Sequence, residues 1–428
     1  MTTCVIGAGA AGLSAARHLK ASAIPFEVVE RERDVGGIWD ASLPHSPVYP
    51  SAHLISSKPL TQFTDFPMPR EYPDYPDHGQ ALEYLRAYAR RNELYGHIRF
   101  EQTVERAERM EGGGWKVSFA GGEARTYEGL IIAAGIHWVP IMPQLPGTFQ
   151  GDCTHSRGYK TPDIFRGKRV LVVGAGNSGC DIAVDASEQA ERTFLSVRRG
   201  YHFIPKYAFR RPIDQVGELS LKLHLPLPVR RTLNELVLKS VVGGPEEYGL
   251  PRPDHRLLES HPIVNSRILP ALRRGDLRPK PDVVELSNRE VVFKDGSSEP
   301  IDIIVFATGY QVTFPFLEHR HLNSSDGRPD FYLHVFHPTC DDLFILGMIQ
   351  PDSGVWPLMD LQARAVARYI LAAAVEGPAI RKVRALKRGR PPDLSGGIRY
   401  LKSERHRYEV EHSTYARQLR KVARLLRP

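Results

Sequence analysis

The stretch CVIGAGAAG at residues 4–12 decides the fold of this chain, because it joins a short apolar strand to a glycine-rich turn. The run LSAARHL at residues 13–19 follows it and favours a helix. In a turn of GxGxxG spacing, the first glycine (Gly7) permits the tight bend and the second (Gly9) lets a pyrophosphate approach the backbone. The third, Gly12, lets the helix pack close to the strand. The stretch therefore predicts a strand, turn and helix that bind a dinucleotide.

The same design recurs in the middle of the chain. The strand-like run RVLVV at residues 169–173 leads into GAGNSG at 174–179, and the small-residue run CDIA follows. One GxGxxG turn is weak evidence, but two copies, each between a strand and a helix, predict two Rossmann-type units. An anion would sit at each helix N-terminus. The candidate nucleotide-binding residues of this second unit are Gly174, Gly176, Asn177, Ser178 and Gly179.

The residues at the end of the next strand distinguish the two nucleotides. After the first turn, the run FEVV at residues 26–29 ends in Glu30, whose carboxylate suits a free ribose diol and would repel a 2′-phosphate. After the second turn, the run FLSV at 194–197 ends in Arg198 and Arg199 with no acid, which suits the 2′-phosphate of NADPH. The alternative for this pair is two surface arginines without a ligand.

These patterns predict an α/β fold with two Rossmann-type dinucleotide-binding domains, the NADPH domain being inserted into the other. The apolar strand at 301–306 is interpreted as the return of the chain to the first domain, and a further strand at 343–347 and a helix at 361–373 follow it. The predicted division is 1–160 for the first domain, 161–300 for the insertion, 301–385 for the return segment and 386–428 for a C-terminal extension. The stretch 201–263 is predicted to be partly helical and near the substrate.

Composition narrows the chemistry. The chain has 428 residues, of which 42% are hydrophobic and 25% charged, as in a globular protein. Its four cysteines stand far apart at positions 4, 153, 180 and 340. That spacing argues against a disulfide scaffold, a zinc site and a dithiol redox centre, so no metal is expected and redox chemistry must come from a cofactor.

Charge and hydropathy suggest where the protein works. The sequence has neither a signal-peptide pattern nor an apolar stretch of about 18 residues, so we expect a cytoplasmic protein that does not span a membrane. The net charge is +8, and residues 381–428 alone carry fifteen Lys or Arg against four Asp or Glu. We expect no nucleic-acid partner, because the apolar residues of the tail recur at helical spacing and predict a helix packed on the body. The oligomeric state stays open, with a homodimer as one option.

Beyond the turns, the chain resembles the flavin-containing monooxygenase family. Residues 149–159, FQGDCTHSRGY, match the family signature FxGxxxHxxx(Y/F) in full. GGIW at 36–39 is similar to the segment that lies beside the flavin. Further matches are FTDFP at 63–67, residues 174–183, 306–310, 347–350 and 361–364, so the resemblance extends to about residue 375.

The resemblance implies both cofactors and a reaction. FAD would occupy the first unit and NADPH the second, and reduced flavin would react with O₂ to give a C4a-hydroperoxide that oxidises a nucleophilic N or S of a small-molecule substrate. Further cofactor-binding residues implied in this way are Gly37, Ile38, Trp39, Val104 and Gln350. The signature would place His155 and Tyr159 near the nicotinamide nucleotide.

One departure from the family bears on the substrate. Oxidisers of amines and sulfides usually carry an asparagine near the reactive flavin edge, whereas this chain reads HLISSKP at 53–59. Ser56, Ser57 and Lys58 are therefore the candidate catalytic residues, although the two serines could equally shape a turn. Two rival activities stay open. They are a Baeyer–Villiger monooxygenase, whose members usually show Trp-Pro where this chain has Tyr159-Lys160, and an NADPH-dependent flavin reductase.

Overall fold

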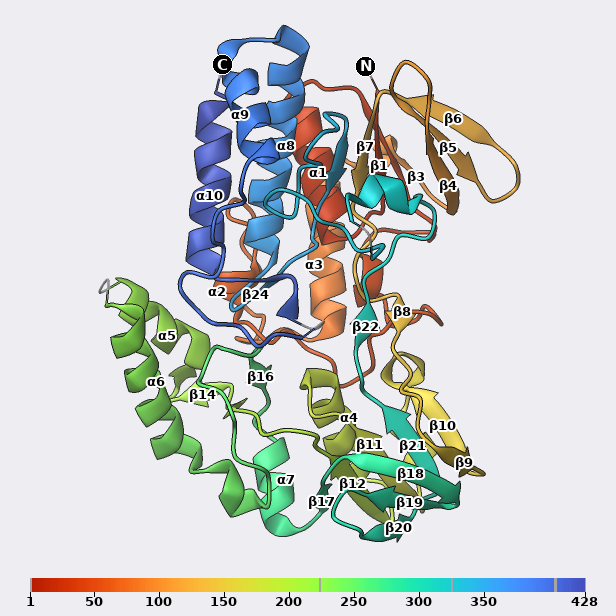
Figure 1. Cartoon of the computed structure of the whole chain (residues 1–428), viewed down its shortest axis with the longest axis vertical. Helices are drawn as coiled ribbons and strands as arrows, with labels where there is room; N and C mark the ends of the chain where they lie inside the picture. The colour runs from red at the N-terminus through yellow and green to blue at the C-terminus, as the bar shows by residue number, and fades with distance from the viewer. Residues whose placement is uncertain (1, 223–224, 325, 404–405, 428) are drawn as a thin grey trace.

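The computed structural model describes residues 2–222, 225–324, 326–403 and 406–427. It shows two α/β domains stacked along the long axis of the molecule (Figure 1). Each domain has a five-stranded parallel sheet at its centre. The predicted fold class, with one Rossmann-type domain inserted into the other, is confirmed.

The first sheet holds strands from both ends of the chain, which is what an insertion requires. Its order is β23-β7-β1-β2-β3. These strands are β1 (Thr3–Ile6), β2 (Phe26–Val29), β3 (Ile98–Arg99), β7 (Gly129–Ile132) and β23 (Leu343–Ile345). Because parallel strands are buried on both faces, they read as continuous apolar runs, such as the fully buried GLII of β7.

Each face of the first sheet packs against a different layer. Alternate side chains such as Val5 and Ile131 join the core formed with the helices, whereas Cys4 and Ile132 join the core formed with an antiparallel meander. The helices are α1 (Ala10–Ala21), α3 (His78–Arg91) and α8 (Trp356–Val375). The meander consists of β4 (Val104–Arg109), β5 (Trp115–Phe119) and β6 (Ala124–Tyr127).

The second domain repeats this three-layer plan. Its sheet order is β10-β21-β11-β12-β17, with a helical layer on one face and a second, mixed sheet on the other. The sheet strands are β10 (Asp152–His155), β11 (Arg169–Val173), β12 (Arg192–Ser196), β17 (Leu277–Lys280) and β21 (Ile303–Phe306). The helices are α4 (Asn177–Ser187) and α7 (Ile268–Arg274). The opposite face is covered by β9 (Gly147–Phe149), β18 (Val283–Asn288), β19 (Glu290–Phe293) and β20 (Ser298–Pro300).

The pairing of strands moves both predicted limits of the insertion. Strand β10 already belongs to the second sheet, so the predicted start at 161 is too late. Strand β21 pairs with β11 and β10, so residues 301–306 lie in the inserted domain and the predicted return at 301 is wrong. The chain crosses between domains at β8 (Val139–Pro140) and β22 (Tyr310–Gln311), which pair as an antiparallel ribbon. The prediction failed because the apolar run at 301–306 fits a buried strand of either sheet equally well.

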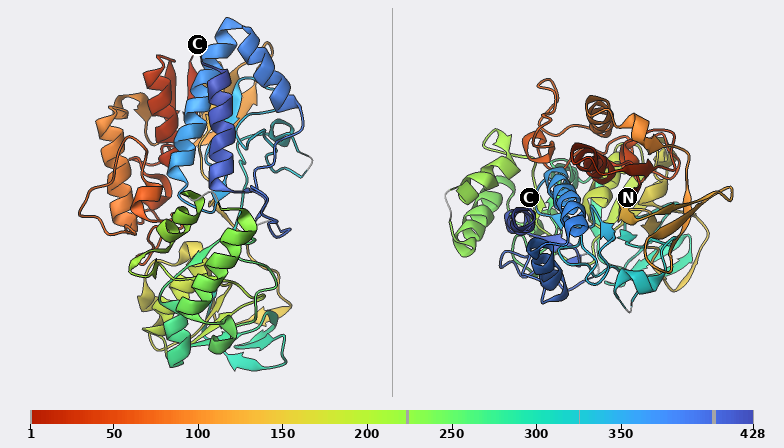
Figure 2. Two further views of the ribbon diagram at one scale, coloured as in Figure 1. Left: turned by 90° about the vertical axis from the view of Figure 1, so that its left-hand side faces the viewer. Right: turned by 90° about the horizontal axis from the view of Figure 1, so that it is seen from above.

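The C-terminal extension belongs to the first domain. Helix α10 (His412–Leu425) lies along α8 beside α9 (Pro378–Arg388), as both views show (Figures 1 and 2). The expected helical spacing is confirmed, because Tyr415, Leu419 and Val422 are all buried. The arginines at 417, 420 and 424 are exposed, so the basic residues form the solvated face.

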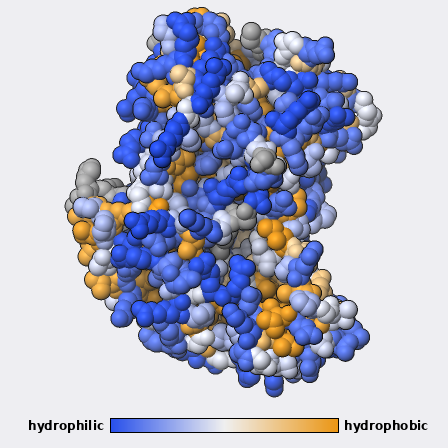
Figure 3. All heavy atoms as spheres, in the orientation of Figure 1, coloured by the Kyte–Doolittle hydropathy of each residue, from blue (hydrophilic) through white to orange (hydrophobic). Residues whose placement is uncertain are grey.

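The stretch 201–263 forms an outer helical layer beside the second domain. It contains α5 (Ile213–Lys222) and α6 (Leu227–Val242), together with the short strands β13 (Phe203–Ile204), β14 (Tyr207–Ala208), β15 (Arg211–Pro212) and β16 (Ile263–Val264). Figure 3 shows apolar side chains on this side of the surface, and Val229, Leu233 and Leu236 of α6 are exposed. The expectation of a partly helical segment is confirmed.

Candidate functional site

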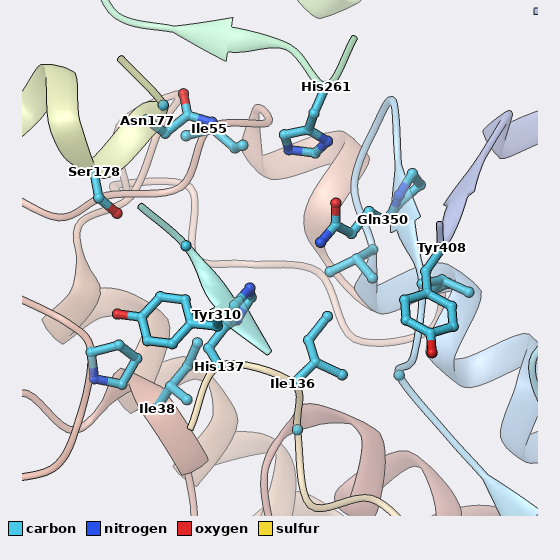
Figure 4. Close-up of a pocket in the computed structure, with 18 of the residues that line it drawn as sticks. Ile38, Ile55, Ile136, His137, Asn177, Ser178, His261, Tyr310, Gln350 and Tyr408 are labelled. Carbon is cyan, nitrogen blue, oxygen red and sulfur yellow. The ribbon is translucent and has the colours of Figure 1, made fainter. Parts of the chain in front are cut away.

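One cavity of about 1560 Å³ reaches from the first glycine-rich turn to the second. It opens at the carboxyl ends of both parallel sheets, where ligands bind in open α/β folds. A pocket for one small ligand occupies roughly 300–1,000 Å³, so this cavity has room for more than one ligand. Figure 4 shows lining residues from both domains, including Ile38 and Gln350 of the first and Asn177 and Ser178 of the second.

The first turn fits a dinucleotide through its backbone. Gly7 has φ +102°, in the left-handed region, and a Cβ there would stand 2.6 Å from the carbonyl oxygen of Ala133. A Cβ on Gly12 would stand 1.8 Å from the carbonyl oxygen of Gly7, so strand and helix approach as closely as glycine allows. Gly9 is the N-cap of α1 and lines the cavity. No described side chain caps α1, so its first N–H groups are available for a pyrophosphate.

Glu30 lies at the end of β2, where the sequence predicted the ribose-binding carboxylate. It is 6% exposed and lines the cavity. Its Oε2 accepts a hydrogen bond from the backbone N–H of Ala8 (2.5 Å), and its Oε1 accepts one from that of Glu32 (3.0 Å). Burial raises the pKa of Glu30, while the two backbone donors favour its charged form. The carboxylate is thus held against the turn, at the position where the sequence predicts contact with a ribose diol.

The remaining predicted flavin-side residues also line the cavity. Gly37, Ile38 and Trp39 form the short 3-10 helix η1 (Gly37–Trp39), and the Trp39 ring meets Trp356 edge to face at 6.0 Å. Val104 at the start of β4 and Gln350 in β24 (Gln350–Pro351) complete this side.

The second turn repeats the geometry of the first. Gly174 has φ +106°, and a Cβ on Gly179 would stand 1.8 Å from the carbonyl oxygen of Gly174. Gly176 is the N-cap of α4, again without a capping side chain among the described residues. Asn177 and Ser178 line the cavity, and Asn177 also joins the turn to the loop before β16, as its Nδ2 donates to the carbonyl of Pro262 at 3.0 Å.

The two arginines predicted to read the 2′-phosphate differ in their surroundings. Arg198 is exposed and lines the cavity. The Arg199 guanidinium instead donates to both carboxylate oxygens of Asp254 at 2.8 Å. Arg198 is therefore the better placed of the two for an anionic ligand.

His155 and Tyr159, the signature residues, do not line the cavity. Tyr159 is fully buried in the core of the second domain, where its hydroxyl donates to Asp185 at 2.9 Å and its ring stacks on Phe165. His155 is 7% exposed, its Nδ1 accepts from the backbone N–H of Arg157 (3.2 Å), and burial lowers its pKa. Both residues shape the domain from behind the lining, and their contact with the nicotinamide nucleotide stays a prediction.

The three candidate catalytic residues are not equivalent either. Ser56 lines the cavity. Ser57 is fully buried, and its backbone N–H donates to Asp214 at 2.6 Å. The Lys58 ammonium donates to three carbonyl oxygens of the loop 69–72 at 2.6 to 3.3 Å. Lys58 therefore ties a loop, and a catalytic role for it is not supported because its donors are already used.

The sequence analysis missed a group of polar lining residues. His137 and Tyr310 flank the crossing between the domains, with ring centroids 5.3 Å apart, and burial lowers the pKa of His137 to about 4. His261 and Tyr408 enter from the helical layer and the C-terminal extension (Figure 4). For His137 and Tyr310, the one sequence clue to a place in the lining is that they lie next to the crossings between the domains. Nothing in the local sequence marks His261 and Tyr408 as lining residues.

The described residues 2–222, 225–324, 326–403 and 406–427 provide neither a metal site nor a membrane-spanning helix. Within those ranges, no three His, Cys, Asp or Glu side chains are grouped to hold a metal ion. No helix of the described chain is long and apolar enough to cross a bilayer.

Comparison with known proteins agrees with this geometry. The family described as flavin-binding monooxygenase-like matches residues 2–383. Flavin-containing monooxygenase 2 of Homo sapiens is 33% identical over 386 residues, 85% of this chain and 72% of that protein. Flavin-containing monooxygenase 5 of Oryctolagus cuniculus is 34% identical over 384 residues, 84% of this chain and 71% of that protein.

Solved structures share the fold. The S-allyl-L-cysteine S-oxygenase of Allium sativum aligns with TM-score 0.65 at 21% identity, covering 99% of this chain and 88% of that one. Cyclohexanone monooxygenase from Rhodococcus sp. Phi1 bound to NADP⁺ aligns with TM-score 0.69 at 18% identity, covering 99% and 97%. The match to the family over most of the chain, together with the two glycine-rich turns on one cavity, shows that this protein belongs to the flavin-binding monooxygenases, enzymes whose cofactors are FAD and NADPH.

Proposed function

We propose that this enzyme uses NADPH and O₂ to place one oxygen atom on a nucleophilic nitrogen or sulfur of a small molecule. The observation that carries the proposal is the cavity lined by both nucleotide-binding turns, because hydride transfer and oxygen transfer would then take place in one shared space. Relatives 33% identical are named N-oxide-forming dimethylaniline monooxygenases, which supports nitrogen as one target.

The chain's own residues bind, orient and exclude water. Glu30 and the turn at Gly7 to Gly12 would hold FAD, and Arg198 with the turn at Gly174 to Gly179 would hold NADPH. When bound, the flavin supplies hydride acceptance and oxygen activation. His137 is uncharged near neutral pH because burial lowers its pKa to about 4, so it would not present an acidic imidazolium that could protonate the lone pair of a nearby substrate.

Ser56 is the proposed substitute for the family asparagine. Ser56 lines the cavity, whereas the next two residues are engaged elsewhere. Ser57 donates its backbone N–H to Asp214, and the Lys58 ammonium donates to the loop 69–72. Ser56→Ala should therefore raise the share of NADPH lost as hydrogen peroxide, whereas Lys58→Met should lower thermal stability and leave that share unchanged.

Stopped-flow spectroscopy tests the proposed reaction. Protein reduced anaerobically with NADPH is mixed with O₂, and a transient absorbance distinct from oxidised and reduced flavin is expected, decaying faster when an amine or a sulfide is present. Product analysis then compares a sulfide with a ketone of similar size. Preference for the ketone would indicate Baeyer–Villiger oxidation, and direct return to oxidised flavin with peroxide release would indicate a reductase.

The cytoplasmic location expected from the sequence remains a proposal, and the homodimer remains one option for the oligomeric state. Cell fractionation tests the first, and light scattering during size-exclusion chromatography tests the second.

A further inference from the structure

The C-terminal segment, of which the structure describes residues 401–403 and 406–412, lies beyond the family match, which ends at residue 383, and it contacts both domains. On the first-domain side, its strand β25 (Glu409–Val410) pairs in parallel with β24. The backbone N–H of Gln350 donates to the carbonyl of Tyr408 at 2.8 Å, and that of His412 donates to Asp352 Oδ1 at 2.9 Å. The segment is thereby anchored beside the flavin-side wall of the cavity.

On the other side, the same segment holds three consecutive residues of the insertion. The backbone N–H of Leu401 donates to the carbonyl of Glu259 (2.9 Å), and His406 Nε2 lies 3.2 Å from the hydroxyl of Ser260. Glu409 Oε1 lies 3.1 Å from Nδ1 of His261, and the Glu409 side chain is 1% exposed. A buried carboxylate needs polar partners, and His261 is one of those that Glu409 has, so neutralising Glu409 should disturb both segments.

Residues 259–261 lead directly to the second nucleotide-binding turn. Pro262 and Val264 hold the side chain of Asn177 from both sides, because Asn177 Nδ2 donates to the Pro262 carbonyl (3.0 Å) and its Oδ1 accepts from the Val264 N–H (2.9 Å). Asn177 is the first residue of α4 and lies within the GxGxxG turn. Figure 4 shows His261, Asn177 and Gln350 on the rim of the same space.

We infer that Glu409 and His261 are positioning residues through which the C-terminal segment sets the NADPH-binding turn against the flavin-side wall of the cavity. Glu409 does not line the cavity, so it acts through His261 and the loop 262–264. Hydride transfer needs reacting atoms within about 3.5 Å, and a misplacement of about 1 Å can cost roughly 100-fold in rate. A buried contact between the domains therefore bears on catalysis without touching either ligand.

The test compares two variants that each remove one charge from a buried His–carboxylate pair. Glu409→Gln breaks the pair between the domains, and Asp360→Asn breaks the His18–Asp360 pair (2.8 Å), which lies within the first domain. Both are purified as full-length flavoprotein, and NADP⁺ binding is measured by calorimetry. Glu409→Gln should raise the Kd for NADP⁺ about five- to tenfold and raise the share of NADPH lost as peroxide. Asp360→Asn should change neither, and both variants should retain FAD.

A double-mutant cycle tests the route. If Glu409 acts through Asn177, the effects of Glu409→Gln and Asn177→Ala on NADP⁺ affinity should be non-additive, and additive effects would refute that route. Equal Kd values for Glu409→Gln and the parent would refute the inference as a whole. If Glu409→Gln does not fold, Glu409→Asp and Ser260→Ala weaken the same contacts and are judged by the same Kd. Because NADP⁺ binding is measured without substrate, failure of the proposed N- or S-oxidation would leave this result intact.

Discussion

The two glycine-rich turns have nearly the same backbone but different surroundings. Gly7 and Gly174 have φ of +102° and +106°, and in both turns a Cβ on the third glycine would stand 1.8 Å from the carbonyl oxygen of the first. Each turn leads to a helix with a glycine N-cap. The shared geometry explains why both units bind a dinucleotide, but it cannot explain which one.

The charges around the turns account for the difference. Glu30, at the first turn, is buried and bonded to the turn itself, whereas the equivalent strand end of the second unit carries the exposed Arg198. The helices differ as well. The second residue after the third glycine is the buried Ser14 in α1 and the partly exposed Asp181 in α4. The comparison supports the proposal that the backbone selects a dinucleotide, and that neighbouring side chains select between a ribose diol and a 2′-phosphate.

The strongest way to break the comparison is to place a methyl group at the equivalent glycine of each turn. Gly12→Ala and Gly179→Ala create the same clash, which neither backbone can absorb without moving. Gly12→Ala should yield protein without bound flavin. Gly179→Ala should remain yellow but be reduced by NADPH about 100-fold more slowly. Absorbance spectra and anaerobic stopped flow measure both, and loss of flavin from both variants would contradict the division of roles.

Removing the charge of Glu30 sharpens the first half of the comparison. Glu30→Gln weakens the hydrogen bonds that a charged acceptor makes, so FAD should dissociate about 10- to 100-fold more readily, as expected for ~1.5–3 kcal/mol. Glu27→Gln on the same strand is the control, because Glu27 pairs with Arg125 (2.9 Å) and does not line the cavity. Flavin fluorescence during dilution measures the release.

Removing the charge of Arg198 tests the part of the comparison that concerns the second turn. Arg198→Ala should lower kcat/KM for NADPH by about tenfold and leave that for NADH nearly unchanged, because only NADPH carries the 2′-phosphate. Arg199→Ala should have the smaller effect, since Asp254 already occupies its guanidinium. Steady-state rates with both nucleotides decide the matter, and an equal loss for NADPH and NADH would show that Arg198 does not read the phosphate.

The smallest effect concerns pH. Burial raises the pKa of Asp181 to about 7, above the value of about 3.9 expected in the unfolded chain. Between pH 4 and 7 the unfolded state has lost this proton while the folded state keeps it, so the free energy of unfolding falls as pH rises through that range. Asp181→Asn mimics the neutral acid and should raise the Tm by roughly 3 °C at pH 8 but not at pH 4. Calorimetry at both values measures the difference.

The sequence predicted the features that depend on local backbone chemistry. The glycine spacing, the strand runs and the acid at position 30 are short-range patterns, and the structure places them as expected. The return at 301 was wrong because an apolar run does not say which sheet it joins. Lys58 and Tyr159 are absent from the lining because their partners, the loop 69–72 and Asp185, are brought to them only by tertiary folding.

The ribbon of β8 and β22 has a consequence for how the chain folds. Val139 and Gln311 are paired partners, so the insertion begins and ends at nearly the same point in space. Once the insertion has folded, its two ends lie next to each other. The entropy cost of joining the two parts of the first domain is then close to that of closing a short hairpin loop rather than a very long loop. The two parts of the first domain are thus brought together by the domain that separates them in the sequence. Folding should proceed from the middle of the chain outward.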